Sequence, residues 1–216
     1  MQVNAMSNQE TIDDLKYATA LAKSNHEGPL VGGPIGLMWG ILISATLFAQ
    51  WCIITDIIGT EPQYLWLLWV GFTAVGCMGS AILGRKVGSK EGANSIANRI
   101  ENAVWTMFGL MFGCMLVGIV ISMLLGIGSV ALFDLVPIVG FGGQGLAYGV
   151  IAKVSHHKWL GYAAGAAFVT SILCMQAFGQ PELYLLAAIA TLFTVVVPSL
   201  KSMGIEHAEQ NYPNRC

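Results

Sequence analysis

Six long apolar runs leave this chain few folds other than a bundle of membrane-spanning helices. Each run is close to the roughly 20 residues that a helix needs to cross about 30 Å of hydrocarbon. A backbone in lipid must satisfy its own hydrogen bonds, so each run is predicted to be helical, and none shows the alternation of a barrel strand. The predicted spans are Ile35–Ile54, Tyr64–Leu83, Val104–Leu124, Val130–Ile151, Trp159–Phe178 and Leu183–Leu200.

The composition agrees with this prediction. Charged residues make up only 10% of the 216 residues, whereas soluble chains carry about a quarter. They lie in short intervals between the apolar runs, because hydrocarbon excludes them. The first thirty residues are polar and lack the apolar core of a signal peptide, so the first span is expected to serve as the insertion signal. The predicted fold class is an all-α polytopic membrane protein with six transmembrane helices.

Positive charge indicates how the helices are oriented. All ten Lys and Arg residues precede the first span, follow the sixth, or lie between the second and third or the fourth and fifth. The alternate loops carry only Asp56, Glu61 and Glu182 as charged residues. The positive-inside rule therefore predicts that both termini are cytoplasmic. The general composition is typical of a small bacterial inner-membrane protein.

Three parts of the chain are expected. Residues 1–30 form a cytoplasmic amphipathic helix and linker, residues 31–201 the six-helix membrane domain, and residues 202–216 a cytoplasmic tail. Ser7 and Glu10 have the spacing of a capping box at the start of the N-terminal helix. This helix could lie on the membrane surface, dock a partner or pack against its own membrane domain, and we favour the last.

The third membrane helix is expected to continue beyond the membrane. Apolar residues keep helical spacing through Ser89–Asn102 and directly into the third span. We interpret this stretch as a solvated helix extension rather than a site. Its polar side chains, Asn98 and Glu101 among them, are therefore expected to face water.

Glycine pairs with four-residue spacing recur in the odd-numbered spans. Each pair lies in the predicted cytoplasmic half near a tryptophan, and each even-numbered span ends in a basic exit. This pattern favours three helical hairpins related by a parallel threefold repeat, although the residue-level match is poor. Small residues at this spacing let helices approach closely, so most pairs should serve internal packing and one could serve oligomerisation. The pairs are Gly36 and Gly40, Gly109 and Gly113, and Gly161 and Gly165.

The fourth span holds the strongest candidate for a polar site in the membrane. Asp134 is the only acidic residue well inside an apolar segment. It lies about one turn inside the outer boundary, so it could reach the headgroups or cap a neighbouring helix. The alternative is a proton or cation site, formed with Gln144 or with Gln50 and Thr46 of the first span.

The rest of this span allows two interpretations as well. Pro137 removes one backbone hydrogen bond and is expected to kink the helix. The glycines from Gly140 to Gly145, with Gly143 and Gln144 between them, could let the chain unwind and present carbonyl groups. The alternative is a smooth face against which a neighbouring helix packs.

Other chemistries find little support in the sequence. All four histidines lie at or beyond the predicted cytoplasmic ends of the spans, so haem ligation inside the bundle is not expected. The five cysteines have no paired spacing, and four are expected to act as small apolar residues. No metalloprotease, serine-hydrolase or phosphate-loop motif occurs. We therefore predict neither a catalytic residue nor a metal or other cofactor.

These observations favour a protein that acts through contacts. We expect an accessory, scaffolding or signal-relaying subunit that meets the lipid bilayer and a protein partner, through its cytoplasmic face or as a homo-oligomer, and no nucleic acid. The docking elements would be the N-terminal helix and the Ser89–Asn102 extension. The alternative is a small transporter or channel with a pathway near Asp134, Pro137, Gly143 and Gln144. A membrane enzyme ranks third, because acid–base or metal chemistry needs several convergent ionisable groups.

Overall fold

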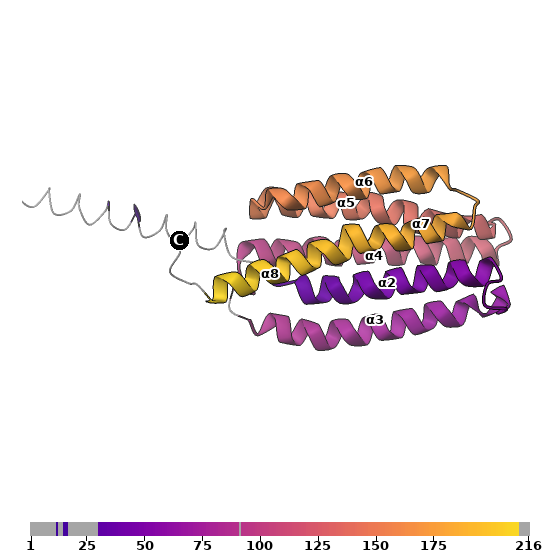
Figure 1. The fold of residues 1–216 in the computed structure, drawn as a ribbon, viewed down its shortest axis with the longest axis horizontal. Helices are drawn as coiled ribbons and strands as arrows, with labels where there is room; N and C mark the ends of the chain where they lie inside the picture. Colours follow the sequence, from indigo (N-terminus) through magenta and orange to yellow (C-terminus); the bar gives the residue numbers. More distant parts are fainter. Residues whose placement is uncertain (1–11, 13–14, 17–29, 91, 212–216) are drawn as a thin grey trace, which may run out of the picture.

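In the computed structural model the chain forms an elongated bundle whose helices run along one axis (Figure 1). The structure describes residues 12, 15–16, 30–90 and 92–211. Within these residues there is no strand, and six helices are long and apolar enough to cross a membrane. The predicted class is confirmed: this is an all-α polytopic membrane protein. The predicted N-terminal helix lies outside the described residues except at Ile12, Leu15 and Lys16, and residues 212–216 of the predicted tail lie outside them as well.

The helices follow the predicted spans closely, and the last one is longer than expected. Its three segments are continuous, and the middle one is a π-helical turn in which the Val197 amide donates to the Leu192 carbonyl. The elements are α2 (Gly33–Ile54), η1 (Pro62–Tyr64), α3 (Leu65–Gly88), α4 (Ile96–Leu124), η2 (Val130–Asp134), α5 (Leu135–Ser155), α6 (Lys158–Gln176), α7 (Glu182–Thr191), η3 (Leu192–Val196) and α8 (Val197–Asn211). We call the end of the bundle where α2 begins and α8 ends the basal end, and the opposite end the distal end.

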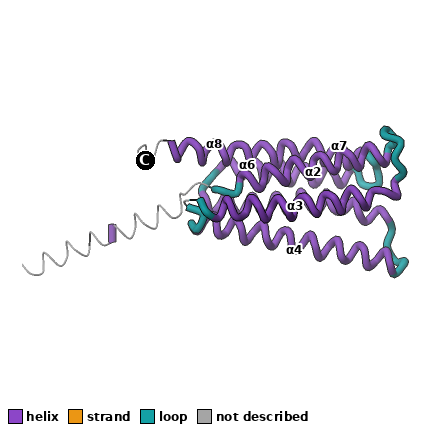
Figure 2. The backbone as a smooth tube through the Cα atoms, turned by 90° about the horizontal axis from the view of Figure 1, so that it is seen from below, coloured by secondary structure: helices purple, strands orange, loops and turns teal. Residues whose placement is uncertain are grey.

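The helices pack unequally. The closest pair is α5 with α6, and α2 packs against α7, η3 and α8 in the middle of the bundle. The two remaining helices are peripheral, because α3 packs mainly on α2 and α4 mainly on α5, and they lie along one side of the bundle (Figure 2). The expected hairpins are not equivalent: α5 and α6 belong to different ones, and α6 packs only loosely on α7. The hairpin arrangement and the threefold repeat therefore stay predictions.

The first glycine pair has the packing role that its spacing predicts. A Cβ atom built at Gly36 would lie 2.5 Å from Oγ of Ser199, and one at Gly40 would lie 2.8 Å from Cγ2 of Val196. Both glycines thus let α2 approach the last helical segment closely. This contact joins the first and last spans across the whole length of the sequence.

The other two pairs do not pack internally. A Cβ atom built at Gly109, Gly113, Gly161 or Gly165 meets nothing within 4 Å. All four residues lie on exposed faces of α4 and α6. The expectation that most pairs serve internal packing is therefore wrong for these two, which leave shallow notches on the outside of the described bundle.

Gly76 of α3, which belongs to none of these pairs, lies at the contact between α2 and α3. The indole of Trp39 on α2 lies over Gly76, where a Cβ atom would come within 2.7 Å of Cζ3. Its Nε1–H donates to Oγ of Ser80 at 2.9 Å. The ring also meets Phe72 edge to face, with centroids 5.5 Å apart. One tryptophan thus supplies an apolar contact and a polar contact to α3.

Candidate functional site

Asp134 is enclosed at the distal end of the bundle. Its residue is 7% exposed, so it does not reach toward headgroups. One carboxylate oxygen accepts from the Tyr184 hydroxyl of α7 at 2.6 Å, and the other accepts from the Gly179 amide at 3.0 Å. Gly179 has a φ of 80° in the turn between α6 and α7, a conformation that suits glycine. The carboxylate therefore fastens this turn and the start of α7 to the start of α5.

The contacts of Tyr184 extend this arrangement to the first two spans. Gln50 of α2 lies beside the Tyr184 hydroxyl. Its Oε1 accepts from Nε1 of Trp69 on α3 at 2.9 Å. We call Asp134, Tyr184, Gln50 and Trp69 the distal network. The expectation that Asp134 is near Gln50 is supported, but the link runs through Tyr184, which the sequence analysis did not single out.

Asp134 and Gln144 do not form one site. They are ten positions apart along η2 and α5, and at 1.5 Å per helical residue this places them about 15 Å apart along the axis. Gln144 instead faces the last helical segment. The two side chains therefore do not share one polar site, and a pathway near Asp134, Pro137, Gly143 and Gln144 stays a prediction.

The fourth span also lacks the kink and the unwinding considered for it. Pro137 falls in the first turn of α5, where its missing N–H costs no intrahelical bond. The helix then runs unbroken from Leu135 to Ser155. Its glycines receive aromatic rings: a Cβ atom at Gly143 would lie 2.7 Å from Cε2 of Phe108, and one at Gly145 would lie 2.9 Å from Cδ1 of Phe168. The glycine run is a packing face for α4 and α6.

Gln144 compensates for a backbone irregularity in the last span. Its Nε2 donates to the Thr194 carbonyl at 2.8 Å, and Gln144 is 6% exposed. Thr194 lies in the π-helical turn, and Pro198, four residues later, has no N–H to give to that carbonyl. A side chain from α5 therefore supplies the donor that the last helix lacks.

This pairing predicts a coupling between two substitutions. Gln144→Leu is expected to lower the free energy of unfolding by about 1 kcal/mol, because the Thr194 carbonyl loses its donor in an apolar setting. In a Pro198→Ala background the restored amide can serve that carbonyl, so the same substitution should cost clearly less. Thermal unfolding of the four proteins in one lipid or detergent measures the coupling. Equal costs in both backgrounds would contradict this role.

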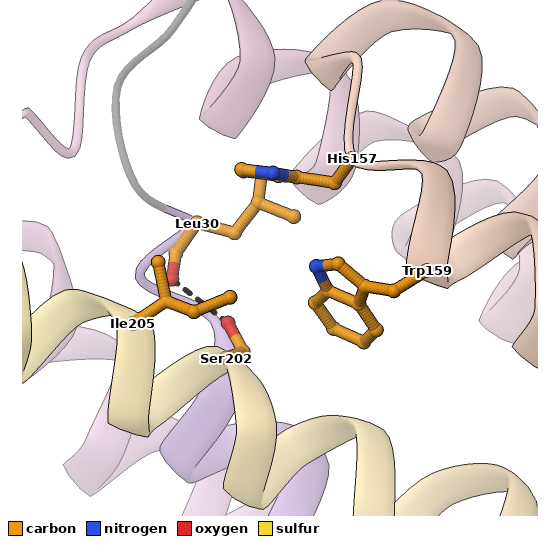
Figure 3. Close-up of a pocket in the computed structure, with 5 residues that line it drawn as sticks. All are labelled: Leu30, His157, Trp159, Ser202 and Ile205. Carbon is orange, nitrogen blue, oxygen red and sulfur yellow. Dashed lines mark hydrogen bonds between the residues drawn. The ribbon is translucent and has the colours of Figure 1, made fainter.

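The basal end carries a shallow recess lined by residues from three parts of the chain. Leu30, His157, Trp159, Ser202 and Ile205 surround it, and it has no interior room for a ligand (Figure 3). Nζ of Lys201 lies 5.1 Å from the centroid of the Trp159 ring. The indole nitrogen of Trp159 is buried and has no hydrogen-bond partner among the described residues.

Beside this recess, the residues that lead into α2 are held by side chains of two other helices. Ser202 Oγ of α8 donates to the Leu30 carbonyl at 3.0 Å (Figure 3). The Val31 amide donates to Oδ1 of Asn98 at 3.0 Å, and the Gly32 amide donates to Glu101. Asn98 is 5% exposed and Glu101 is partly buried. The expectation that these polar side chains of the Ser89–Asn102 extension face water is therefore wrong.

The sequence contains one indication of this contact, which could be interpreted only once the structure was known. Asn98 and Glu101 are three positions apart and so share one face of α4. They lie ahead of the apolar stretch that begins at Val104, in a position that a solvated helix end would also occupy. The partner groups are backbone amides more than sixty residues away, and backbone amides leave no mark in a sequence.

No protein-family model matches the chain, and comparisons with curated proteins and with solved structures gave no match either. No group of three or more His, Cys, Asp or Glu residues in the described part of the chain is placed to hold a metal ion. The fold thus defines the class, a helical polytopic membrane protein, and its function has to be argued from its own surfaces.

Proposed function

We propose that this protein acts through lateral contacts in the membrane, as an accessory, scaffolding or signal-relaying subunit. The observation that carries the proposal is the exposure of α3 and α4: only 6% of the apolar window of each is buried, against 39% for α2. Each of these helices packs mainly on one neighbour. On α4 the open side includes the Gly109 and Gly113 notch, a surface suited to close approach of another helix.

The interior supports the same proposal over transport. The basal recess lined by Leu30, His157, Trp159, Ser202 and Ile205 has no room for a ligand, and it lies at one end rather than along the bundle. Asp134, which a pathway would use, already accepts two hydrogen bonds that join helices. Its role in the distal network is that of a fastener.

A native cysteine allows the contact to be tested. Cys114 is exposed and adjoins Gly113 on α4, whereas Cys174 is 0% exposed. A variant that keeps only Cys114 should give one discrete cross-linked product in its own membranes with a short bifunctional maleimide, and a variant that keeps only Cys174 should give none. The mass of the product distinguishes a second copy of the chain from another protein. Gly109→Leu with Gly113→Leu should reduce its yield by about tenfold, because bulky side chains block close approach.

Four outcomes would count against α4 as the contact face or against the proposed function itself. Absence of a product from Cys114 in native membranes, or a product that the glycine substitutions leave unchanged, argues against α4 as the contact face. A complex that survives gentle solubilisation, and is lost on deletion of residues 1–28, would instead place the contact at the basal side. Proton- or ion-coupled flux through the purified protein in liposomes would favour the transporter.

We also propose that the membrane is a bacterial inner membrane and that the basal end is cytoplasmic. The distribution of charge supports the orientation, because the charged residues of the distal loops are Asp56, Glu61 and Glu182. The described Lys and Arg residues within and between the spans gather at the basal end: Arg85, Lys86, Lys90, Arg99, Lys153, Lys158 and Lys201. Labelling of single cysteines in the two sets of loops by an impermeant reagent, on intact and on opened cells, tests the orientation.

A further inference from the structure

The three residues that lead into α2, Leu30, Val31 and Gly32, are more firmly held than a loop of this kind requires. We call them the basal linker. Leu30 and Val31 are 4% and 3% exposed. The linker makes hydrogen bonds with Ser202 of α8 and with Asn98 and Glu101 of α4. Residues on two distant helices therefore converge on one short backbone segment, to which residues 1–29 are joined.

Two of these contacts hold backbone amides next to the N-terminus of α2, whose first turn has no side-chain cap. Gly32 occupies the N-cap position of α2 and offers no side chain to bind the free amides of the first turn. Asn98 and Glu101 bind amides immediately before that turn from another helix. A Cβ atom at position 32 would lie 2.9 Å and 3.0 Å from the two oxygens of Glu101. Glycine is thus required for the carboxyl group to come this close.

Asn98 and Ser202 do not titrate, and Asn98 is also fixed from its other side. Its Nδ2 donates to the Gly92 carbonyl at 3.0 Å and to Oγ of Ser95 at 2.9 Å. Glu101 is therefore the only linker-binding side chain among the described residues whose charge can change.

Glu101 lies outside the part of α4 that crosses the membrane. The apolar stretch from Val104 to Leu124 alone is long enough to span about 30 Å of hydrocarbon, so the preceding turn lies at or beyond the membrane surface. Burial raises the pKa of the Glu101 carboxyl from 4.5 to about 7, and the hydrogen bond from Gly32 acts in the opposite direction. Removal of a carboxylate from water without a nearby cation disfavours its ionised form.

The surroundings of the carboxyl group offer no such cation. Tyr148 of α5 is the titratable side chain that faces it, and a neutral phenol supplies no positive charge. The linker contributes backbone groups only. Arg99 of α4 is exposed, and two positions along a helix place it on nearly the opposite side. No Lys, Arg or His among the described residues contributes to the pKa shift.

We propose that Glu101 makes the basal linker a pH-sensitive clamp: its neutral carboxyl group keeps the linker docked against α4, and ionisation favours release of the linker. The carboxyl group gains access to water when the linker opens, so opening becomes easier as the pH rises from the ordinary carboxyl pKa toward that of the docked group. Above the latter the effect is complete and levels off. A further effect of release, a change in a partner contact, rests on the function proposed above. The clamp itself does not depend on that function.

Hydrogen exchange of the full chain in lipid nanodiscs reads the clamp directly. After correction for the intrinsic exchange rate, protection of the Val31 and Gly32 amides should fall roughly fiftyfold between about pH 5 and about pH 7.5, then change little. In Glu101→Gln the amide oxygen can still accept from Gly32 and cannot ionise, so protection should stay at its low-pH level throughout. Glu182→Gln, at an exposed carboxylate at the distal end, should keep the wild-type response.

Each outcome bears on the proposal. Wild-type protection that does not depend on pH overturns the clamp without recourse to any variant, even if Glu101→Gln fails to fold. An unchanged pH response in a folded Glu101→Gln protein overturns the role of this residue. If the Cys114 product is absent but the pH response is present, the proposed function fails and the clamp stands. If the product is present but the pH response is absent, the contact face on α4 stands and the clamp fails.

Discussion

Replacement of Asp134 by alanine is expected to lower the free energy of unfolding by roughly 2–4 kcal/mol. Both donors that meet the carboxylate lose their acceptor. The buried Tyr184 hydroxyl is left unsatisfied, which costs about 1–3 kcal/mol, and the Gly179 amide in its exposed turn loses one hydrogen bond, worth about 1 kcal/mol. Relief from burying the carboxylate offsets part of this loss. Thermal or denaturant unfolding in a defined lipid or detergent measures the change.

Glu182→Ala is a suitable control for this variant, because it removes an exposed carboxylate at the same end of the bundle. It should change stability by no more than about 0.5 kcal/mol. If Asp134→Ala is as stable as this control, the distal network is not a fastener. The same contacts affect how a flux measurement on Asp134→Asn is interpreted. In that variant one amide oxygen must accept from both donors, or the NH₂ group must face the Gly179 amide. A loss of flux would therefore have to be separated from a loss of stability.

The second large effect is expected at the interface between α2 and α3. Gly76→Val should lower the free energy of unfolding by about 3 kcal/mol, because the added side chain occupies the space of the Trp39 ring. The indole cannot move aside easily, since it is bonded to Ser80 and packed against Phe72. As α3 packs mainly on α2, loss of this contact should separate α3 from the bundle.

Gly71→Val serves as the matched control on the same helix. A Cβ atom there meets nothing within 4 Å, and valine is compatible with a lipid-facing helix surface. Its effect should be small in comparison. Similar stability losses for the two variants would indicate that helix propensity, rather than the Trp39 contact, explains the cost.

The number, type and approximate bounds of the spans could be predicted from the sequence because these follow from local properties. Hydrocarbon requires a helix in each long apolar run whatever its neighbours are. The same reasoning singled out Asp134 and Gln144 as polar residues in an apolar span. It placed Gly36 and Gly40 at a helix contact correctly, since small residues at this spacing favour close approach.

Partners could not be predicted in this way. Gln144 donates to the Thr194 carbonyl because Pro198, which lies in a different helix from Gln144, has no N–H for it. Asp134 likewise binds a turn 45 residues away. The Gly109 and Gly161 pairs share the spacing of Gly36 and Gly40 and yet face outward. The spacing of residues along one helix does not show whether the face that carries them packs against another helix or is exposed.

The apolar runs thus made the chain a six-span helical membrane protein, because the bilayer acts on each segment separately and its length and polarity are properties of the residues alone. The tertiary structure decided which polar groups became fasteners, which glycines stayed open, and that Glu101 meets the basal linker. These contacts join residues far apart in the chain, and many of their partners are backbone groups. Their existence depends on how whole helices pack, which no single segment specifies.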